Sequence, residues 1–469
     1  MRTAPVDNES SYMVLYVSDL YTLFHQIEIG KKILIEPFLI IAVILLISRR
    51  ENMESGESTQ QGVSKRYMIF LVVVMGLVSQ MDSWLSLIET KALPGIIDTF
   101  WNNPVGVARD AALSEFALLQ GIFGIIVFGV FFIAWFADAY GRRTGMFVLV
   151  LTMGIPAILI VFLSINVYVF LLLYSIVIMA TTSNLWEVPI SEEAPPKSRG
   201  LYGSAAFLIG VIPLYAILGS SIIDSYGWQW GYGVMFFLMV VLMILLYFMK
   251  EPQRWIASAA DREKRLGIMQ ALRKLGSEDR KYIIIAMTVY LCWTISFKMA
   301  TTWGGEYFTV VLGRTDFNTI LTIAGLLLPL SALISGILLD RIGRNYVLII
   351  GSLGAVISMV ALGLTGMPAT YQAAYFFMAM ILAWIYVYLA EIFKTEVRST
   401  SIGVCVTGAR LGYVVGPLLS ALLIDMFAAT TWNGFWIFAG LLMLVPLFTL
   451  LAKPLETKGK TLEEIEAER

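Results

Sequence analysis

The sequence predicts an all-α membrane protein of twelve helices, arranged as two six-helix bundles related by a parallel pseudo-two-fold repeat. Three observations support this fold class. The chain of 469 residues is 58% hydrophobic and only 14% charged, whereas soluble proteins carry about 25% charged residues. Its apolar residues gather in runs long enough to cross a bilayer. Short charged motifs recur at matching places in the two halves.

Twelve apolar runs have the roughly 20 residues that a helix needs to cross about 30 Å of hydrocarbon. None alternates strictly between apolar and polar residues, so each is predicted to be a helix rather than a strand. The predicted spans are approximately 67–93, 114–136, 145–164, 167–188, 201–223, 229–249, 282–300, 318–338, 346–365, 370–390, 401–424 and 432–452.

Lysine and arginine residues concentrate in alternate connections between these spans. Each connection on one side carries at least two of them, whereas the opposite loops hold only Arg109 and Arg314, with Lys91 at one edge. Because basic residues accumulate on the cytoplasmic side of a membrane, both ends of the twelve-span core are predicted to be cytoplasmic. The expected location is the plasma membrane.

The spans and loops divide the chain into five parts. These are an N-terminal extension (1–66), a first bundle (67–249), a cytoplasmic linker (250–281), a second bundle (282–452) and a cytoplasmic tail (453–469). The linker pattern predicts an amphipathic helix over 262–276. The apolar run 33–48 in the extension has two interpretations: an extra membrane helix, or an upstream segment that precedes a true start at Met53.

Charged motifs repeat after equivalent spans of the two halves. An aspartate, a glycine and arginines follow spans 2 and 8, and glutamate–arginine pairs follow spans 4, 6 and 10. An Arg–carboxylate fork fixes geometry, and glycine suits a tight reversal. With six spans per half, the halves run in the same sense, which places a substrate site between them. The motif residues are Asp138, Gly141, Arg142, Arg143, Glu192, Arg199, Glu251 and Arg254, then Asp340, Arg341, Gly343, Arg344, Glu391, Arg398 and Glu456.

At these residues the chain resembles the major facilitator superfamily, and within it the sugar-porter-like group. The run Asp340-Arg-Ile-Gly343-Arg344 is similar to the superfamily signature, and 454–466 (PLETKGKTLEEIE) is similar to the group's C-terminal signature. The resemblance implies a secondary active transporter that works by alternating access. It also implies that the cytoplasmic charges form a gate that holds the two halves together in the outward-open state.

The chain departs from that group at two places. Span 7 contains no glutamine, and Leu172 stands where sugar-binding members carry an arginine in span 4. The expected substrate is therefore a small polar organic solute, an organic acid or a sugar-like molecule, with proton coupling. The alternatives are a drug or metabolite exporter of the same fold, and a non-transporting membrane sensor.

Four ionisable residues lie inside predicted spans: Asp82, Glu187, Lys298 and Arg410. Such groups cost at least about 2.5–3.5 kcal/mol each and suggest function. Asp82 is the candidate proton or substrate site, because a carboxylic acid shielded from water can bind and release protons. The alternatives are an ion pair with Lys298 or exposure at the outer mouth. Lys298 and Arg410 could bind a carboxylate, and Glu187 could belong instead to the cytoplasmic gate.

A second candidate gate lies at the other end of span 7. Gly304 and Gly305 could hinge the helix, and Tyr307 and Phe308 could close the outer side. The alternative is close helix packing by small residues.

Few residues suggest other chemistry. Cys292 and Cys405 lie in apolar runs and are expected in the core, and His25 is the single histidine. We therefore expect no metal, no cofactor and no enzymatic site. The expected partners are a small-molecule substrate, the lipid bilayer and protons, without nucleic acid, for a monomeric protein.

Overall fold

The computed structural model describes residues 64–194, 199–252, 255–256, 276–393, 398–428, 431–460 and 462–468. The run 33–48, the possible start at Met53, the predicted helix 262–276 and Arg254 lie outside these residues. All regular elements in the described ranges are helical.

The first half contains six spans, several of them interrupted. Span 1 is α3 (Lys65–Leu87) and α4 (Glu89–Phe100), and span 3 is α7 (Arg142–Leu163). Span 2 consists of α5 (Val107–Phe123), η2 (Gly124–Gly129) and α6 (Val130–Tyr140), and span 4 of α8 (Val167–Thr181) and α9 (Glu187–Glu193). Span 5 consists of α10 (Arg199–Gly210), η3 (Tyr215–Gly219) and α11 (Ser220–Tyr226), and span 6 of α12 (Trp228–Gly233) and α13 (Met235–Tyr247).

The second half contains the other six spans. Span 7 is α16 (Ser277–Glu306) with η5 (Tyr307–Val311), and spans 8 to 10 are α17 (Phe317–Ile342), α18 (Arg344–Thr365) and α19 (Pro368–Ile392). Span 11 consists of α20 (Arg398–Arg410) and α21 (Gly412–Phe427), and span 12 of α22 (Asn433–Leu441), α23 (Leu444–Thr449) and η7 (Leu450–Ala452). The short α24 (Leu462–Glu468) follows.

The twelve predicted spans are confirmed within the described residues. Eleven helices are long and apolar enough to cross a membrane, and the shorter apolar helix Val167–Thr181 accounts for the twelfth. Span 4 is not one continuous helix, however. Thr181 and Thr182 donate to backbone carbonyls, and the Ser183 hydroxyl accepts from Leu185 N. Side-chain hydrogen bonds of this kind compete with the helical ladder, and Asn184 adopts a positive φ of 49° at the break.

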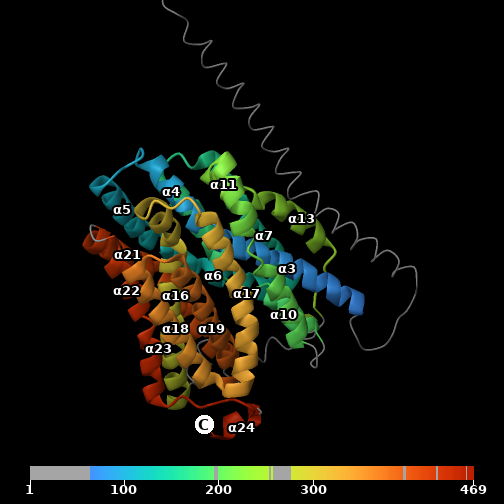
Figure 1. Cartoon of the computed structure of the whole chain (residues 1–469). Helices are drawn as coiled ribbons and strands as arrows, with labels where there is room; N and C mark the ends of the chain where they lie inside the picture. Colours follow the sequence, from blue (N-terminus) through green and yellow to red (C-terminus); the bar gives the residue numbers. More distant parts are fainter. Residues whose placement is uncertain are drawn as a thin grey trace, which may run out of the picture.

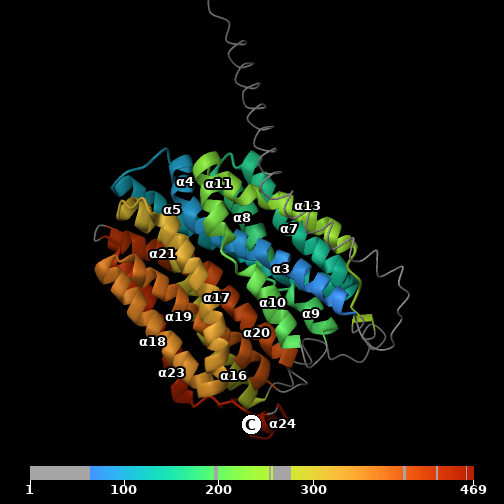
Figure 2. The ribbon, with the colours of Figure 1, turned by 45° about the vertical axis from the view of Figure 1, so that its right-hand side comes forward.

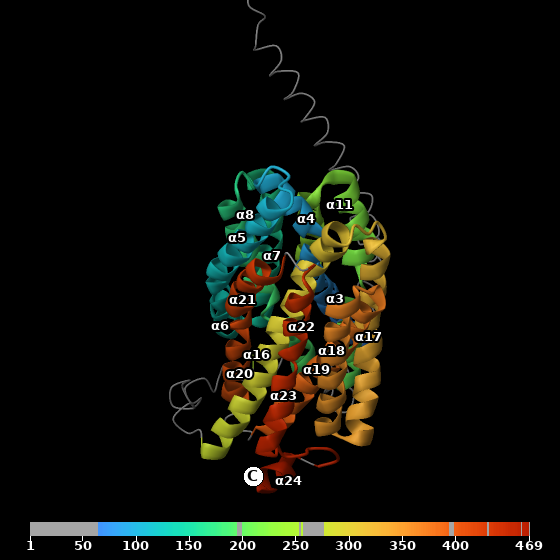
Figure 3. The same cartoon turned by 60° about the vertical axis from the view of Figure 1, so that its left-hand side comes forward.

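The two halves lie side by side and meet along two pairs of helices. α4 packs along α16, and α5 packs along α21. The end of the molecule that carries α4 and α11 lies opposite the end that carries α24 (Figures 1 and 3). Figure 2 shows α3, α7 and α13 of the first half on the right and α18, α19 and α23 of the second half on the left. Between the halves, η3 of span 5 also contacts α17. The cytoplasmic orientation predicted for the tail makes the α24 end the cytoplasmic one.

Candidate functional site

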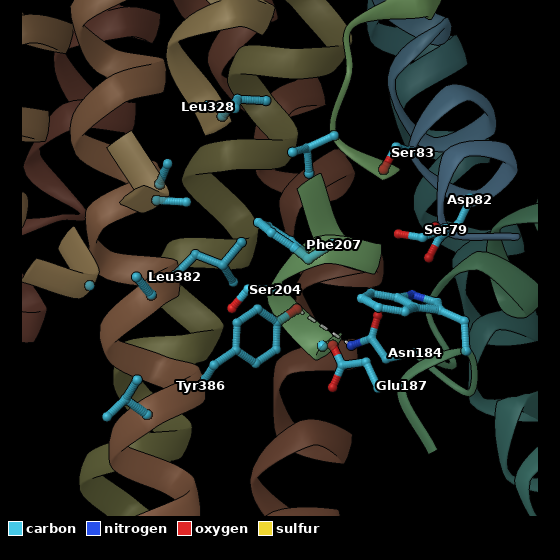
Figure 4. A pocket seen from close by; sticks show the side chains of 18 of the residues that line it. Ser79, Asp82, Ser83, Asn184, Glu187, Ser204, Phe207, Leu328, Leu382 and Tyr386 are labelled. Carbon is cyan, nitrogen blue, oxygen red and sulfur yellow. Dashed lines mark hydrogen bonds between the residues drawn. The ribbon is translucent and has the colours of Figure 1, made fainter. Parts of the chain in front are cut away.

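A cavity of about 580 Å³ lies between the two halves. Asp82 and Ser79 from α3 face it on one side, and Tyr386 and Leu382 from α19 face it on the other (Figure 4). Asn184 Nδ2 donates to the Tyr386 hydroxyl across the cavity at 3.5 Å. The other polar lining residues are Ser83, Ser86, Glu187, Ser191 and Ser204, and the aromatic ones are Trp186, Phe207, Trp293 and Phe297. Both halves therefore contribute to one partly aromatic, partly acidic chamber.

The cavity extends toward the α24 end of the molecule, which is the predicted cytoplasmic end. Its wall includes Ser191, which adjoins the motif residue Glu192, and Leu339, which precedes the motif residue Asp340. The opposite end is closed by the contacts described below. With the orientation predicted from the sequence, this arrangement corresponds to an inward-facing state.

Asp82 is half-buried in the cavity wall. The Ser86 hydroxyl donates to its Oδ1 at 3.3 Å, and no Lys or Arg forms an ion pair with it in the described ranges. The alternative pairing of Asp82 with Lys298 is not formed. Glu187, the second predicted acid, is exposed to the same cavity and has no side-chain partner among the described residues. The structure thus brings two predicted acids together in one chamber.

Lys298 pairs with Glu89, a residue that was not predicted from the sequence. The Lys298 ammonium donates to Glu89 Oε2 and to the Tyr174 hydroxyl, the latter at 2.8 Å. Glu89 also accepts from Tyr174 (2.7 Å), Thr302 (3.1 Å) and Gln120. Glu89 is 1% exposed and Lys298 8% exposed. This buried pair joins α4 of the first half to α16 of the second.

A second ion pair joins the halves nearer the outer end. Arg109 Nε lies 2.5 Å from Glu306 Oε1, and its Nη2 lies 2.8 Å from Oε2, so the two side chains form a fork. Arg109 also pairs with Asp98 at 2.6 Å. We call the two pairs Glu89–Lys298 and Arg109–Glu306 the outer lock. Glu306 is fully buried, which makes this fork part of the closed outer side.

The predicted outer-gate residues pack tightly in this state. α16 continues through Gly304 and Gly305 to Glu306. Gly305 lies against the carbonyl of Thr90, and Tyr307 and Phe308 are buried. Thr90 in turn donates to the carbonyl of Thr301 across the two halves. Gly305 therefore allows α4 and α16 to approach closely, whereas Gly304 lies against Tyr371 of α19. The role of the two glycines as a hinge stays a prediction.

We expect Gly305→Ala to hinder closure of the outer side. An added Cβ at Gly305 would overlap the Thr90 carbonyl, and overpacking of this kind costs about 1–3 kcal/mol. Single cysteines placed in the outer half of the cavity should become more accessible to a membrane-impermeant thiol reagent. Gly403→Ala is the matched control, because a Cβ added at Gly403 would meet nothing within 4 Å. Equal accessibility in both variants would contradict the expectation.

Arg410 ends α20 and is 5% exposed. Its Nη2 donates to the carbonyl of Thr182, at the end of α8, so it also reaches across to the other half. Its Nε is buried without a hydrogen-bond partner. The guanidinium interacts electrostatically with Asp82 and with the Tyr290 hydroxyl.

The repeated cytoplasmic motifs have the same internal geometry in both halves. Arg142 pairs with Asp138 and with Glu192 (2.8 Å), and Arg344 pairs with Asp340 (3.3 Å) and Glu391 (2.7 Å). Gly141 and Gly343 have φ of 115° and 110°. Their positive φ lets the chain reverse between two helices.

A glutamate further along each half caps the helix that follows the motif. Glu251 accepts from the backbone N–H groups of Arg142 and Arg143, and Glu456 accepts from those of Arg344 and Asn345. A carboxylate at a helix N-terminus is stabilising. Arg341 contributes its carbonyl, which accepts from Lys458 Nζ at 2.7 Å.

All these motif pairs lie within one half. Arg199 and Arg398 begin α10 and α20, but their side chains lie outside what the structure describes. The clamp between the halves therefore stays a prediction for the outward-open state. A metal site is not apparent, because no group of three or more His, Cys, Asp or Glu in the described ranges could hold an ion.

The comparisons with known proteins agree with this geometry. The family model of the Major Facilitator Superfamily matches residues 103–387 and 307–468. The probable metabolite transport protein CsbC of Bacillus subtilis (strain 168) is 25% identical over 465 residues, which cover 86% of this chain and 94% of CsbC. The galactose-proton symporter of Escherichia coli (strain K12) is 25% identical over 466 residues, which cover 87% of this chain and 96% of the symporter.

Solved structures show the same fold. The inward-open conformation of the xylose transporter XylE from E. coli superimposes with a TM-score of 0.66 at 21% identity, covering 86% of this chain and 100% of that one. Its partially occluded inward-open conformation gives a TM-score of 0.67 at 19% identity, covering 84% and 99%. The family resemblance that the motifs predicted is confirmed.

Proposed function

Because the chain belongs to the Major Facilitator Superfamily, we propose that it is a secondary active transporter that couples the movement of a small polar organic solute to protons. It acts by alternating access in the plasma membrane, as a monomer surrounded by lipid, with its C-terminus in the cytoplasm. Relatives that support proton coupling are a D-xylose-proton symporter of E. coli and an arabinose-proton symporter of B. subtilis.

The observation that carries the proposal is the position of Asp82. Its carboxyl group lines a chamber shared by both halves and has no ion-pair partner in the described part of the chain. A carboxylic acid held in this way can take up a proton from one side and release it to the other when the cavity changes its opening. An exporter of the same fold is less well supported, because the similar proteins named above are symporters and a metabolite transport protein.

The cavity is closed at the outer end and open at the inner end, as expected for one state of an alternating-access cycle. The outer lock closes the outer side while the cavity opens toward the cytoplasm. To open outward, the protein must break both pairs of the lock, and each break exposes charges that water then solvates. The cytoplasmic motifs would then approach and close the inner side.

The test is uptake by the full chain in proteoliposomes. An inwardly directed proton gradient should stimulate uptake of at least one of three radiolabelled probes: D-xylose, D-glucose or D-glucuronate. A protonophore should remove the stimulation. Uptake that ignores both the gradient and the protonophore for all three probes would contradict the proposed coupling.

A further inference from the structure

We propose that the transported solute carries a carboxylate, that Arg410 binds this group, and that the carboxylate and the proton bind together. The inference rests on the proposed function and names the substrate class of the same cavity. It also assigns different roles to Lys298 and Arg410, which the sequence alone treats alike.

Lys298 is already neutralised. Its ammonium contacts Glu89, and three other side chains complete a closed network: Tyr174, which bonds to both charged groups, with Gln120 and Thr302 on Glu89. A solute carboxylate at Lys298 would have to displace a buried glutamate that has no other cation. Arg109 is neutralised in the same way by Glu306 and Asp98. Neither cation is available as an anion site in this state.

Arg410 differs because no carboxylate pairs with it within the described ranges. Its Nη2 donates to the Thr182 carbonyl, the guanidinium also hydrogen-bonds to the Tyr290 hydroxyl, and its buried Nε has no partner. A buried donor without a partner is uncommon in proteins and costs free energy until a ligand or water satisfies it. A guanidinium with free donors binds a carboxylate through two parallel hydrogen bonds.

Arg410 does not line the cavity in this state, but it lies directly behind a segment that does. It contacts Thr182, and the segment that follows carries the cavity residues Asn184, Trp186 and Glu187. Arg410 belongs to the second half and Thr182 to the first, so a ligand bound here would contact both halves. Substrate sites in transporters with repeated bundles lie at this kind of interface.

The charges around Arg410 explain why proton and carboxylate would bind together. Asp82 from α3 interacts electrostatically both with the guanidinium and with Glu187 from α9. With both ionised, the three groups sum to a net charge of −1, and a bound carboxylate would make it −2. Protonation of Asp82 brings the sum back to −1 and so reduces that repulsion. Binding linkage is reciprocal: the factor by which protonation of Asp82 raises the affinity for the carboxylate is also the factor by which the bound carboxylate raises the proton affinity of Asp82.

Apart from Glu89, which pairs with Lys298, the other titratable groups near this cluster in the described part of the chain are hydroxyls. Tyr290 from α16, Tyr386 from α19 and Tyr413 from α21 interact with Arg410 or Asp82. Phenols stay neutral near pH 7 and can donate to a bound carboxylate. The three charged groups therefore set the charge balance of the site.

The experiment compares ligands that differ mainly in charge. Purified full-length protein is titrated with D-glucuronate, D-glucose, D-glucosamine and L-lactate, and binding is followed by thermal stabilisation at pH 6 and pH 8. At least one of the two acids should bind more tightly than glucose and glucosamine, and more tightly at pH 6 than at pH 8. Arg410→Gln should weaken acid binding by about tenfold or more. Arg314→Gln is the matched control, because Arg314 pairs with Asp316 in an outer loop.

Arg410→Lys is a second variant for the case that Arg410→Gln misfolds. It keeps the positive charge but cannot form the two parallel hydrogen bonds of a guanidinium. If Arg410→Gln is not monodisperse, Arg410→Lys should still bind the acid, but more weakly than wild type. The inference is overturned if neither acid binds, if glucose or glucosamine binds as tightly as the acids, or if the Arg410 variants bind the acid like wild type. Gradient-driven uptake of a neutral or cationic probe would overturn the inference and leave the proposed function standing.

Discussion

Asp82→Asn should abolish accumulation of the solute against its gradient while leaving exchange of solute across the membrane. The amide keeps the size and the hydrogen bond from Ser86 but cannot carry a proton, so the cavity would alternate without coupling. In proteoliposomes, we expect the uptake of the mutant to become independent of the pH gradient. Counterflow of labelled against unlabelled solute should remain measurable.

Two variants make this result specific. Asp316→Asn removes an acid that pairs with Arg314 in an outer loop, far from the cavity, and should keep full coupling. Glu187→Gln removes the other acid of the cavity wall. If Asp82→Asn still accumulates solute in response to the gradient and Glu187→Gln does not, the coupling site is Glu187.

The repeat and the spans could be predicted because each leaves a local pattern. Charges are costly in lipid, so the chain places them in short connections where they can be counted. The motif around Asp340 and Gly343 recurs around Asp138 and Gly141 because the same turn is built twice, with the same glutamate cap from Glu251 or Glu456. The caps link residues at similar spacings in the two halves, 109 positions for Arg142 and Glu251 and 112 for Arg344 and Glu456.

The partner of Lys298 could not be predicted from such patterns. Glu89 lies 209 residues away in the sequence, and no periodicity connects a position in span 1 to a position in span 7. Glu89 did leave a signal, since it follows Asp82 by seven residues and so lies on a similar face of the helix two turns later. Its place near the end of an apolar run, next to Lys91, made it resemble a boundary residue.

The break in span 4 also could not be predicted from the composition of the segment. The run 167–188 is apolar enough to read as one helix, yet Thr181 to Asn184 offer side chains that bond to the backbone. This break carries Asn184 and Glu187 to the cavity and frees the carbonyl of Thr182 for Arg410. Whether such a segment stays helical depends on tertiary partners, which a single sequence does not show.

The second large effect is expected at the buried pair of the outer lock. Lys298→Met alone should destabilise the protein strongly, because Glu89 would remain buried with no cation. Breaking a buried pair in this way typically costs about 3–5 kcal/mol. We expect the unfolding temperature of the purified protein to fall sharply. Glu89→Gln alone should have a comparable effect, since it leaves the Lys298 ammonium without a carboxylate.

The double variant distinguishes the interaction between Glu89 and Lys298 from the separate contributions of the two side chains. Glu89→Gln with Lys298→Met removes both charges, and Tyr174, Thr302 and Gln120 can still bond to the new amide. Its unfolding temperature should therefore lie above that of either single variant, which a sum of independent effects would not give. The same comparison on Arg314 and Asp316, an exposed pair within one loop, should show no such recovery. If the effects of Glu89→Gln and Lys298→Met simply add, the two side chains are not coupled, and the Glu89–Lys298 pair of the outer lock does not hold the halves together.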